Sequence, residues 1–219
     1  KALWNGDRGP NTGGMGAYSP TPVLKGELFR QVTEEIAFPT IRTMAELGRP
    51  YRGVLYIGLM ITSDGPKVLE FNARFGDPEA QPLLMRMESD LVPFLEAVVE
   101  RKLAEEGEIV WKNEAAVCVV MASQGYPGSY EKGRQIEGLD KVVSWPDIEA
   151  FHAGTRWEGD RLLTHGGRVL SVTCRAPTLA AAIERAYQGV DQIHWEGAYY
   201  RTDIGYRALD RSGREGKEQ

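Results

Sequence analysis

The chain has 219 residues, of which 42% are hydrophobic and 26% are charged, and its formal net charge is −5. This length and composition are typical of a globular protein with one large or two modest domains. The negative charge argues against nucleic-acid binding, because no basic field is available to replace counterions on phosphates, and no apolar run approaches the roughly 20 residues that cross a membrane.

The cysteines and the first residues add two expectations. Cys118 and Cys174 lie within apolar runs and are predicted to be buried core thiols, with no disulfide framework or zinc site. We also expect no signal peptide, and therefore a reducing cytoplasm. The chain begins at Lys1 without an initiator Met, directly before a glycine-dense stretch, so we expect it to be the middle of a larger protein.

The first predicted elements are a loop and a long helix. Residues 5–22 hold five glycines and three prolines, which excludes a regular helix or central strand and indicates either a linker or a loop whose backbone approaches something closely. Apolar residues then recur at helical spacing over 24–47, where Pro39 marks a kink or a break.

A hairpin and two helices follow. Strands are predicted at 52–62 and 66–72, joined by Ser63-Asp64-Gly65, in which Asp-Gly is a strong hairpin signal. Helices are predicted at 78–86 and 89–103, and Ser89 or Asp90 is expected to cap the second.

The second half of the chain is richer in predicted strands. They are expected at 115–122, 150–157, 160–164 and 167–175, and Thr178 is expected to cap a helix from 179 to about 193. The polar tail beyond Asp210 is expected to fray. We therefore predict an α+β protein with a domain boundary near 104–113, which divides it into residues 1–108 and 109–219.

The stretch from Glu70 to Gln81 carries the strongest chemical signal. In a strand that ends at Asn72, the side chains of Glu70 and Asn72 share a face, because strand side chains alternate with period two. Their oxygens are hard ligands suited to Mg²⁺ with nucleotide phosphates, and the guanidinium of Arg74 follows as an anion clamp. The alternative is a solvated loop, but apolar residues enclose the cluster on both sides, and burial of unpaired charge is costly.

Several long motifs resemble one family of enzymes. Taken in chain order from Lys1 to about Leu209, they are similar to those of the phosphoribosylamine–glycine ligases, also called glycinamide ribonucleotide synthetases, of the ATP-grasp superfamily; the motifs are GDRGPNTGGMGAYSP, GVLYIGLM, EFNARFGDPEAQ, FHAGT, GGRVLSVT and DIGYRAL. The resemblance covers the second half of an ATP-grasp core, an antiparallel sheet with helices, followed by a small β-rich C-terminal domain with a helix. It implies that an N-terminal region, including most of the adenine pocket and the lid, lies elsewhere in the same or another chain.

The resemblance implies a defined chemistry. ATP, glycine and 5-phosphoribosylamine would give glycinamide ribonucleotide, ADP and phosphate in purine biosynthesis, by way of a glycyl phosphate. Such a ligase needs ATP and Mg²⁺ or Mn²⁺, and little covalent help from the protein.

The resemblance also implies roles for particular residues. Glu70 and Asn72 would bind the metal, and Arg74 would contact the transferred phosphoryl group as the catalytic residue. Gly76 and Asp77 would face the substrate, and Asp77 would hold the amine of glycine or a ribose hydroxyl. The other wall of the substrate site would consist of Asp7, Asn11, Thr12, Gly13, Gly14 and Met15. For Asp7, a turn-capping role is the alternative.

This sequence departs from the family pattern in two places. Residues 53–62 contain no acidic residue that could serve as a second metal ligand, and Ala2 and Asn5 stand where the family usually has Arg and Asp. The histidines lack metal-ligand spacing, so His152, His165 and His194 are expected to be structural. Core or interface packing is expected of four tryptophans, Trp111, Trp145, Trp157 and Trp195.

Two other functions remain open at this point. The chain could be an inactive fragment or assembly half that needs a separate N-terminal chain, an idea prompted by the missing lid. It could instead be another ATP-grasp ligase, although the loop PNTGGMGAYSP favours the family named above.

Overall fold

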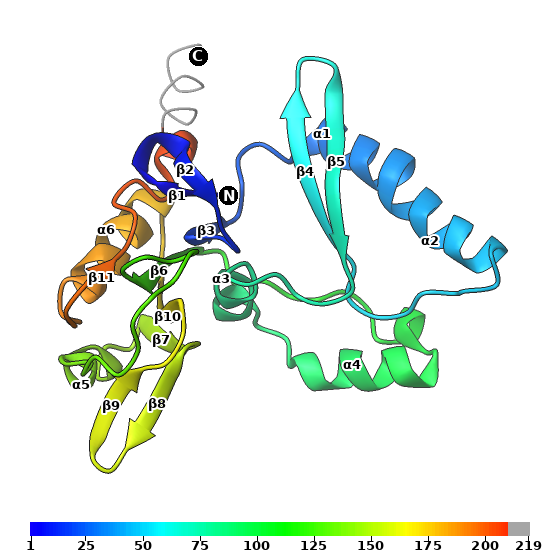
Figure 1. The fold of residues 1–219 in the computed structure, drawn as a ribbon. Helices are drawn as coiled ribbons and strands as arrows, with labels where there is room; N and C mark the ends of the chain where they lie inside the picture. The colour runs from blue at the N-terminus through cyan, green and yellow to red at the C-terminus, as the bar shows by residue number, and fades with distance from the viewer. Residues whose placement is uncertain (210–219) are drawn as a thin grey trace. The chain divides into compact units, whose positions relative to one another are not determined.

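The computed structural model describes residues 1–209, and these form two compact units (Figure 1). The larger unit contains residues 1–20, 77–87 and 112–209, and the smaller unit contains residues 21–76 and 88–111. The polar tail for which fraying was predicted lies outside the described residues.

The two units interleave along the chain. Residues 1–20 and 77–87 belong to the same unit as the C-terminal sheet, although both precede the boundary that the sequence suggested. The spatial units are made of interleaved segments, whereas the predicted division into residues 1–108 and 109–219 follows the order of the chain. That division stays a prediction.

A five-stranded antiparallel sheet forms the centre of the larger unit. Strand β6 (Ala115–Ser123) pairs along one side with β10 (Arg168–Ala176), whose other side pairs with β7 (Ile148–His152). Along its other side β6 pairs with β3 (Gly16–Ser19) and with the short β11 (Ala198–Tyr199). The predictions for β6 and β10 are confirmed to within two residues.

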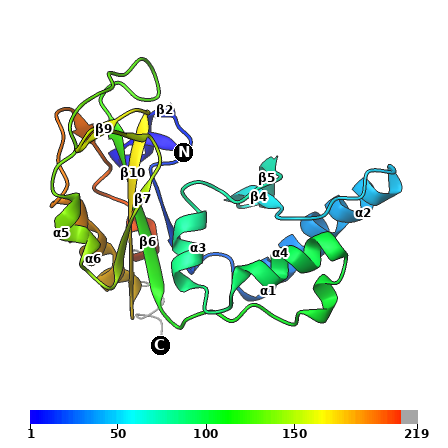
Figure 2. The same cartoon turned by 90° about the horizontal axis from the view of Figure 1, so that it is seen from below.

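Both faces of this sheet are covered. All nine residues of β6 are buried, and alternate ones enter two apolar clusters. One cluster packs β6 and β10 against helix α6 (Leu179–Val190), and helix α3 (Ala80–Arg86) packs on the opposite face, as Figure 2 shows. A strand buried on both faces is continuously apolar, as the sequence AAVCVVMAS of β6 is.

Helix α6 begins where the sequence predicted. The hydroxyl oxygen of Thr178 accepts a hydrogen bond from the amide of Ala181 at 3.2 Å, which satisfies one of the amides that a helix start leaves unpaired. The helix ends at Val190, about one turn before the predicted end. A further short helix of this unit, α5, spans Leu139–Val143.

The predicted strand at 150–157 is wrong, because it is two strands. The first, β7, ends at His152 in the main sheet, whereas β8 (Thr155–Glu158) pairs with β9 (Arg161–Thr164) in a separate hairpin. The chain turns at Gly154, whose amide donates to the Val169 carbonyl at 3.1 Å. A Cβ on Gly154 would lie 2.5 Å from the Arg168 carbonyl oxygen, so only glycine allows this approach.

Part of the glycine-rich stretch is regular, contrary to the prediction of a loop. Strand β1 (Ala2–Trp4) runs through a 3-10 turn (Asn5–Asp7) into β2 (Arg8–Asn11), with which it pairs. Farther on, β3 joins the main sheet. A Cβ on Gly16 would lie 2.7 Å from the Cys118 carbonyl oxygen, so the missing side chain is what allows this strand to dock.

The smaller unit begins with a helical stretch that matches the prediction for 24–47. Helix α1 (Gly26–Gln31) passes into a π-helical turn (Val32–Ala37) and then into α2 (Phe38–Glu46). Of the kink or break predicted at Pro39, the break does not occur, because α2 continues through this residue. The Phe38 amide donates to the Thr33 carbonyl five residues back, and this wider turn accommodates a proline that lacks an amide donor.

The predicted hairpin lies in the smaller unit. Strand β4 (Tyr56–Thr62), which is shorter than predicted, pairs with β5 (Gly65–Asn72). Helix α4 (Leu91–Glu100) is capped by the Asp90 carboxylate, which accepts from the Val92 amide at 2.9 Å; a 3-10 turn (Leu103–Glu105) follows it.

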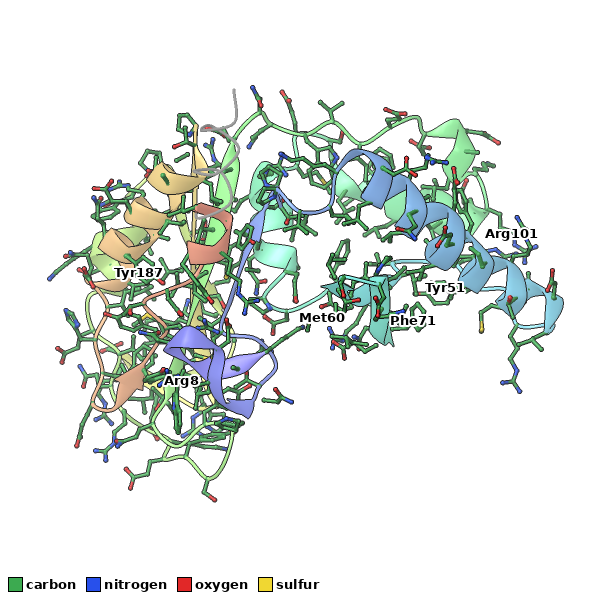
Figure 3. All side chains as sticks on the ribbon, turned by 90° about the horizontal axis from the view of Figure 1, so that it is seen from above. Arg8, Tyr51, Met60, Phe71, Arg101 and Tyr187 are labelled. Atoms are coloured by element: carbon green, nitrogen blue, oxygen red, sulfur yellow. The ribbon has the colours of Figure 1, made fainter. Side chains whose placement is uncertain are left out.

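The smaller unit buries little of its apolar surface. Among its residues, all of which the structure describes, Val32 and Ala97 are the only buried hydrophobic ones. Met60 and Phe71, labelled on the hairpin in Figure 3, are about half exposed. Within residues 1–209, no helix is long and apolar enough to cross a membrane.

Candidate functional site

The predicted site residues fall into both units. The smaller unit carries Glu70, Asn72, Arg74 and Gly76, and the larger unit carries Asp77 and the predicted residues between Asp7 and Met15. The peptide bond between Gly76 and Asp77 joins the two sets.

The end of strand β5 presents the candidate metal pair. Glu70 and Asn72 share one face of the strand, as predicted, and their cross-strand partners are Gly58 and Tyr56. A Cβ on Gly58 would lie 2.9 Å from Cγ of Glu70, so the Glu70 side chain rests over a position that has no side chain. This leaves room for the carboxylate on the face that it shares with the Asn72 amide.

The donor set of this pair fits a magnesium ion that is shared with phosphates. Mg²⁺ usually binds one or two protein ligands and takes its other ligands from phosphate and water. Residues 1–209 contain no group of three or more His, Cys, Asp or Glu side chains arranged to hold a metal alone. One carboxylate and one amide oxygen therefore fit a metal that arrives with a nucleotide, and not a closed structural site.

Arg74 lies beside this pair. Its Nη1 donates to the Phe75 carbonyl at 2.8 Å, and its Nη2 donates to Oδ1 of Asn72 at 3.5 Å. The second contact is at the long limit for a hydrogen bond, so it holds the amide oxygen only weakly. The exposed guanidinium is thus tethered through its terminal nitrogens and keeps further N–H donors for an anion.

The glycine loop between β2 and β3 is ordered by its own hydrogen bonds. The Thr12 hydroxyl donates to the Lys1 carbonyl at 2.8 Å and accepts from the Gly14 amide at 3.0 Å, and the Gly13 amide donates to the Tyr126 hydroxyl at 3.1 Å. Gly14 has a φ of 120°, a conformation that L-residues rarely adopt. The chain can therefore turn at Gly14, which is itself buried.

Two predicted residues at the ends of this loop differ in their setting. Asn11 is exposed at the end of β2, whereas the Met15 side chain is only 3% exposed and lies in an apolar cluster with Val120. The Met15 carbonyl also accepts from the Val120 amide at 3.0 Å. Met15 anchors the loop, so any contact it makes with a substrate would come from its backbone.

A hollow of about 660 Å³ adjoins the loop within the larger unit. Tyr126, whose hydroxyl accepts from Gly13, lines it, and most of its other lining residues are apolar or aromatic: Leu3, Trp4, Pro10, Pro127 and Tyr199. This volume is within the usual range for small-molecule sites.

Asp77 is held by an arginine that the sequence analysis missed. Arg168, at the start of β10, donates from Nη2 to Oδ2 of Asp77 at 2.8 Å and from Nη1 to its backbone carbonyl at 2.7 Å. Oδ1 of Asp77 accepts from Nε2 of Gln81 at 3.0 Å. The motif GGRVLSVT contains Arg168, but nothing in its spacing indicated a partner 91 residues away.

Asp7 lies in a network of internal ion pairs. Its carboxylate accepts from Nη1 of Arg201 at 3.1 Å, from the Tyr206 hydroxyl at 2.8 Å and from Arg207. Burial alone would raise the pKa of Asp7, but the hydrogen bonds from Tyr206 and Arg201 and the charge of Arg207 outweigh it and lower the pKa below its usual value. These contacts support a structural role beside the predicted substrate role.

Arg201 is the centre of that network and was also missed. Its side chain is 8% exposed and donates from Nε and Nη2 to the two carboxylate oxygens of Asp203 at 2.7 and 2.8 Å. The motif DIGYRAL begins at Asp203 and includes Tyr206 and Arg207, so it was a usable signal for this region. Arg201 thereby links the C-terminal segment to Asp7, which lies in the turn between β1 and β2.

The remaining expectations concern side chains with packing roles. Both cysteines are free and buried, and burial raises the pKa of each thiol to about 12. Nδ1 of His152 lies 2.8 Å from the Thr155 hydroxyl, a local turn contact. Trp195 is buried, which agrees with core packing, whereas Trp157 is 65% exposed and is not a core residue.

The comparisons with known proteins agree with the motifs. Two models of one family match the chain: "Phosphoribosylglycinamide synthetase, ATP-grasp (A) domain" over residues 1–80, and "Phosphoribosylglycinamide synthetase, C domain" over residues 116–207.

Individual relatives give the same result. The phosphoribosylamine–glycine ligase of Brucella melitensis is 48% identical over 96% of this chain and 49% of its own length, and the trifunctional purine biosynthetic protein adenosine-3 of Gallus gallus is 50% identical over 95% of this chain and 21% of its own. The crystal structure of the phosphoribosylamine–glycine ligase of Thermotoga maritima has a TM-score of 0.77 at 36% identity, covering 93% of this chain and 49% of that one. The chain thus spans about half the length of the phosphoribosylamine–glycine ligases that it matches, and it belongs to the phosphoribosylglycinamide synthetase family, of whose ATP-grasp (A) domain and C domain it carries matching parts.

Proposed function

We propose that this chain supplies part of the site of a ligase that joins glycine to 5-phosphoribosylamine with ATP, giving glycinamide ribonucleotide, ADP and phosphate. The observation that carries the proposal is that both family models match in order, on a chain whose strand β5 ends in Glu70 and Asn72. The name phosphoribosylamine–glycine ligase of the matched relatives supplies the substrate class.

The reaction divides into two transfers. A carboxylate oxygen of glycine attacks the γ-phosphorus of ATP, the bond to the bridging oxygen breaks, and ADP leaves. The amine of phosphoribosylamine then attacks the carbonyl carbon of the glycyl phosphate, the C–N bond forms as phosphate departs, and the amine loses a proton. Both steps need charge stabilisation and alignment more than covalent help.

The smaller unit would handle the phosphates. Glu70 and Asn72 would hold Mg²⁺ or Mn²⁺, which when bound offsets charge on the transferred phosphoryl group. Arg74 would contact that group through its planar fork of donors, and Gly76 would let the backbone pass close to the substrate. The tethered, exposed guanidinium of Arg74 supports this role.

The larger unit would handle the substrates. Asp77 would hold the amine of glycine or a ribose hydroxyl through a lone pair that its partners leave open. The other substrate wall would be Asp7, Asn11, Thr12, Gly13, Gly14 and Met15, with Met15 acting through its backbone. The ordered loop supports this wall, because its glycines carry no side chain that would keep a substrate at a distance.

A second candidate is that the chain is an assembly half with no turnover of its own. It is favoured by the coverage of about half of each matched ligase and by the sparse burial in the smaller unit. A different ATP-grasp ligase is less well supported, because both family models name the same enzyme family. The buried free thiols fit the cytoplasmic location that the sequence suggested.

The test uses the whole ligase, meaning this sequence together with the N-terminal half that the matched ligases carry. ADP formation should require glycine and phosphoribosylamine together, and Glu70→Ala should lower kcat by about 100-fold or more while raising the Mg²⁺ concentration needed for half-maximal rate. Equal ADP formation without either substrate would refute the function. An unchanged Mg²⁺ dependence in Glu70→Ala would refute the metal assignment alone.

A further inference from the structure

Arg168 connects segments that lie far apart in the sequence. It stands at the start of β10, in the part of the chain that matches the C domain, and it contacts Asp77 and Gly14 in the part that matches the ATP-grasp domain. All three residues belong to the larger unit. The side chain therefore joins a C-domain strand to two loops of the proposed substrate wall.

Both terminal nitrogens of the Arg168 guanidinium make contacts. Nη1 donates to the backbone carbonyl of Asp77 at 2.7 Å, and Nη2 donates to its carboxylate at 2.8 Å. Nη1 also lies 3.4 Å from the Gly14 carbonyl oxygen. A Cβ on Gly13 would lie 3.0 Å from Cζ of Arg168, so the guanidinium occupies the space beside that glycine. A lysine could not make this set of contacts, because its ammonium is a single point of charge.

Asp77 is fixed on every polar atom of its side chain by this arrangement. Arg168 holds Oδ2, Gln81 holds Oδ1, and Arg168 also holds the backbone carbonyl. The Arg168 side chain is 20% exposed and that of Asp77 is 45% exposed, so the pair is partly shielded from solvent and Asp77 retains an open side. A carboxylate held so firmly suits the alignment of a substrate amine.

We propose that Arg168 is a positioning residue of the ligase site, which orders Asp77 and the Gly13–Gly14 loop without contacting the reacting atoms. This inference rests on the proposed function. It gives the C domain a specific part in the reaction: its strand β10 supplies the side chain that aligns the substrate wall.

Matched variants of the whole ligase test this role. Arg168→Met removes the fork and keeps much of the apolar stem. Arg175→Met is the control, since Arg175 lies on the same strand and pairs with Glu114 at 2.7 Å, with similar exposure, but contacts neither loop. Arg168→Lys keeps the charge without the fork.

Hydrogen exchange gives a measure that does not depend on activity. The amides of Gly13 and Gly14, which donate to Tyr126 and Thr12, should exchange about tenfold or more faster in Arg168→Met than in Arg175→Met. Equal exchange in the two variants would overturn the proposal, whether or not the enzyme is active. If loop exchange accelerates but the parent enzyme forms no glycine-dependent ADP, the proposed function fails while the ordering of the loop stands.

Kinetics then separate positioning from a general loss of stability. We expect kcat/KM for glycine to fall about 100-fold in Arg168→Met, with Arg168→Lys recovering only a small part, and to stay within about twofold in Arg175→Met. Adding Asp77→Asn to Arg168→Met should cost little more, because the two residues act as one unit. Fully additive losses, or full activity in Arg168→Lys, would contradict the role of the fork.

Discussion

Gly58 lies directly opposite Glu70 in the β4–β5 ladder, and a Cβ at Gly58 would come within 2.9 Å of Cγ of Glu70. The side chain that is proposed to bind metal thus depends on the absence of a side chain on the neighbouring strand. We expect Gly58→Ala to displace the Glu70 carboxylate and to raise the Mg²⁺ concentration for half-maximal ADP formation by about tenfold.

The measurement is a Mg²⁺ titration of ADP formation in the whole ligase, with Ser63→Ala in the hairpin turn as the control. Ser63 lies outside the β4–β5 ladder. If Gly58→Ala and Ser63→Ala gave the same Mg²⁺ dependence as the parent enzyme, the placement of Glu70 over Gly58 would have no part in metal binding.

Arg201 should be one of the most important side chains for the stability of the larger unit. Arg201→Met leaves the carboxylates of Asp7 and Asp203 without their shared partner, and breaking an ion pair at a buried group costs about 3–5 kcal/mol. Thermal or urea unfolding, followed through the larger unit, measures the loss. Arg156→Met, which removes an exposed pair with Glu158 at 3.7 Å, should change stability by about 0.5 kcal/mol or less; equal effects of the two variants would contradict the importance of the network.

The same network predicts loss of stability in acid. For Asp7 and Asp203, burial acts to raise the pKa, but hydrogen bonds and nearby arginine charges prevail, so both pKa values lie below the usual range. Since the unfolded state then binds more protons over that interval, stability from these groups is full above about pH 4 and is lost as the pH falls through their folded pKa values. Urea midpoints from pH 6 to pH 3 should fall less steeply in Asp7→Asn than in the parent. Identical slopes would refute the attribution of the acid sensitivity to Asp7.

The buried cysteines should be unreactive in the folded protein. Because burial raises the pKa of Cys118 and Cys174 to about 12, almost no thiolate exists at pH 8, and the thiolate is the reactive form. Mass spectrometry after treatment with iodoacetamide should show no adduct without denaturant and two in urea. Rapid labelling of either thiol in the folded chain would show that the main sheet opens.

Local sequence signals predicted much of the fold. The hairpin turn, the Asp90 and Thr178 caps and strands β6 and β10 follow from period, turn residues and capping side chains. The errors arose where long-range contacts decide the outcome. β3 is a strand because Gly16 lets it approach β6, and the predicted strand at 150–157 divides at Gly154 because the backbone of Arg168 lies against it.

The candidate site was predictable to a similar degree. Glu70 and Asn72 share a face because of the strand period, and the motif placed Arg74 beside them. The contacts of Arg168 with Asp77 and of Arg201 with Asp7 were missed because the paired residues lie 91 and 194 positions apart, so no local pattern relates them. The pair of Arg201 with Asp203 is only two residues apart and was also not predicted. Met15 was assigned to the substrate wall from the family resemblance, and the fold buries its side chain, so only its backbone can take that place.

The central claim, that this chain holds one part of a glycine ligase site, is tested most directly by complementation. ADP formation is measured with ATP, Mg²⁺, glycine and phosphoribosylamine for the 219-residue chain alone, for a separately produced N-terminal half, and for the mixture. Glycine- and phosphoribosylamine-dependent ADP should form only in the mixture, and Glu70→Ala should abolish it. Equal turnover by the chain alone, or a mixture whose ADP formation ignores both substrates, would contradict the account.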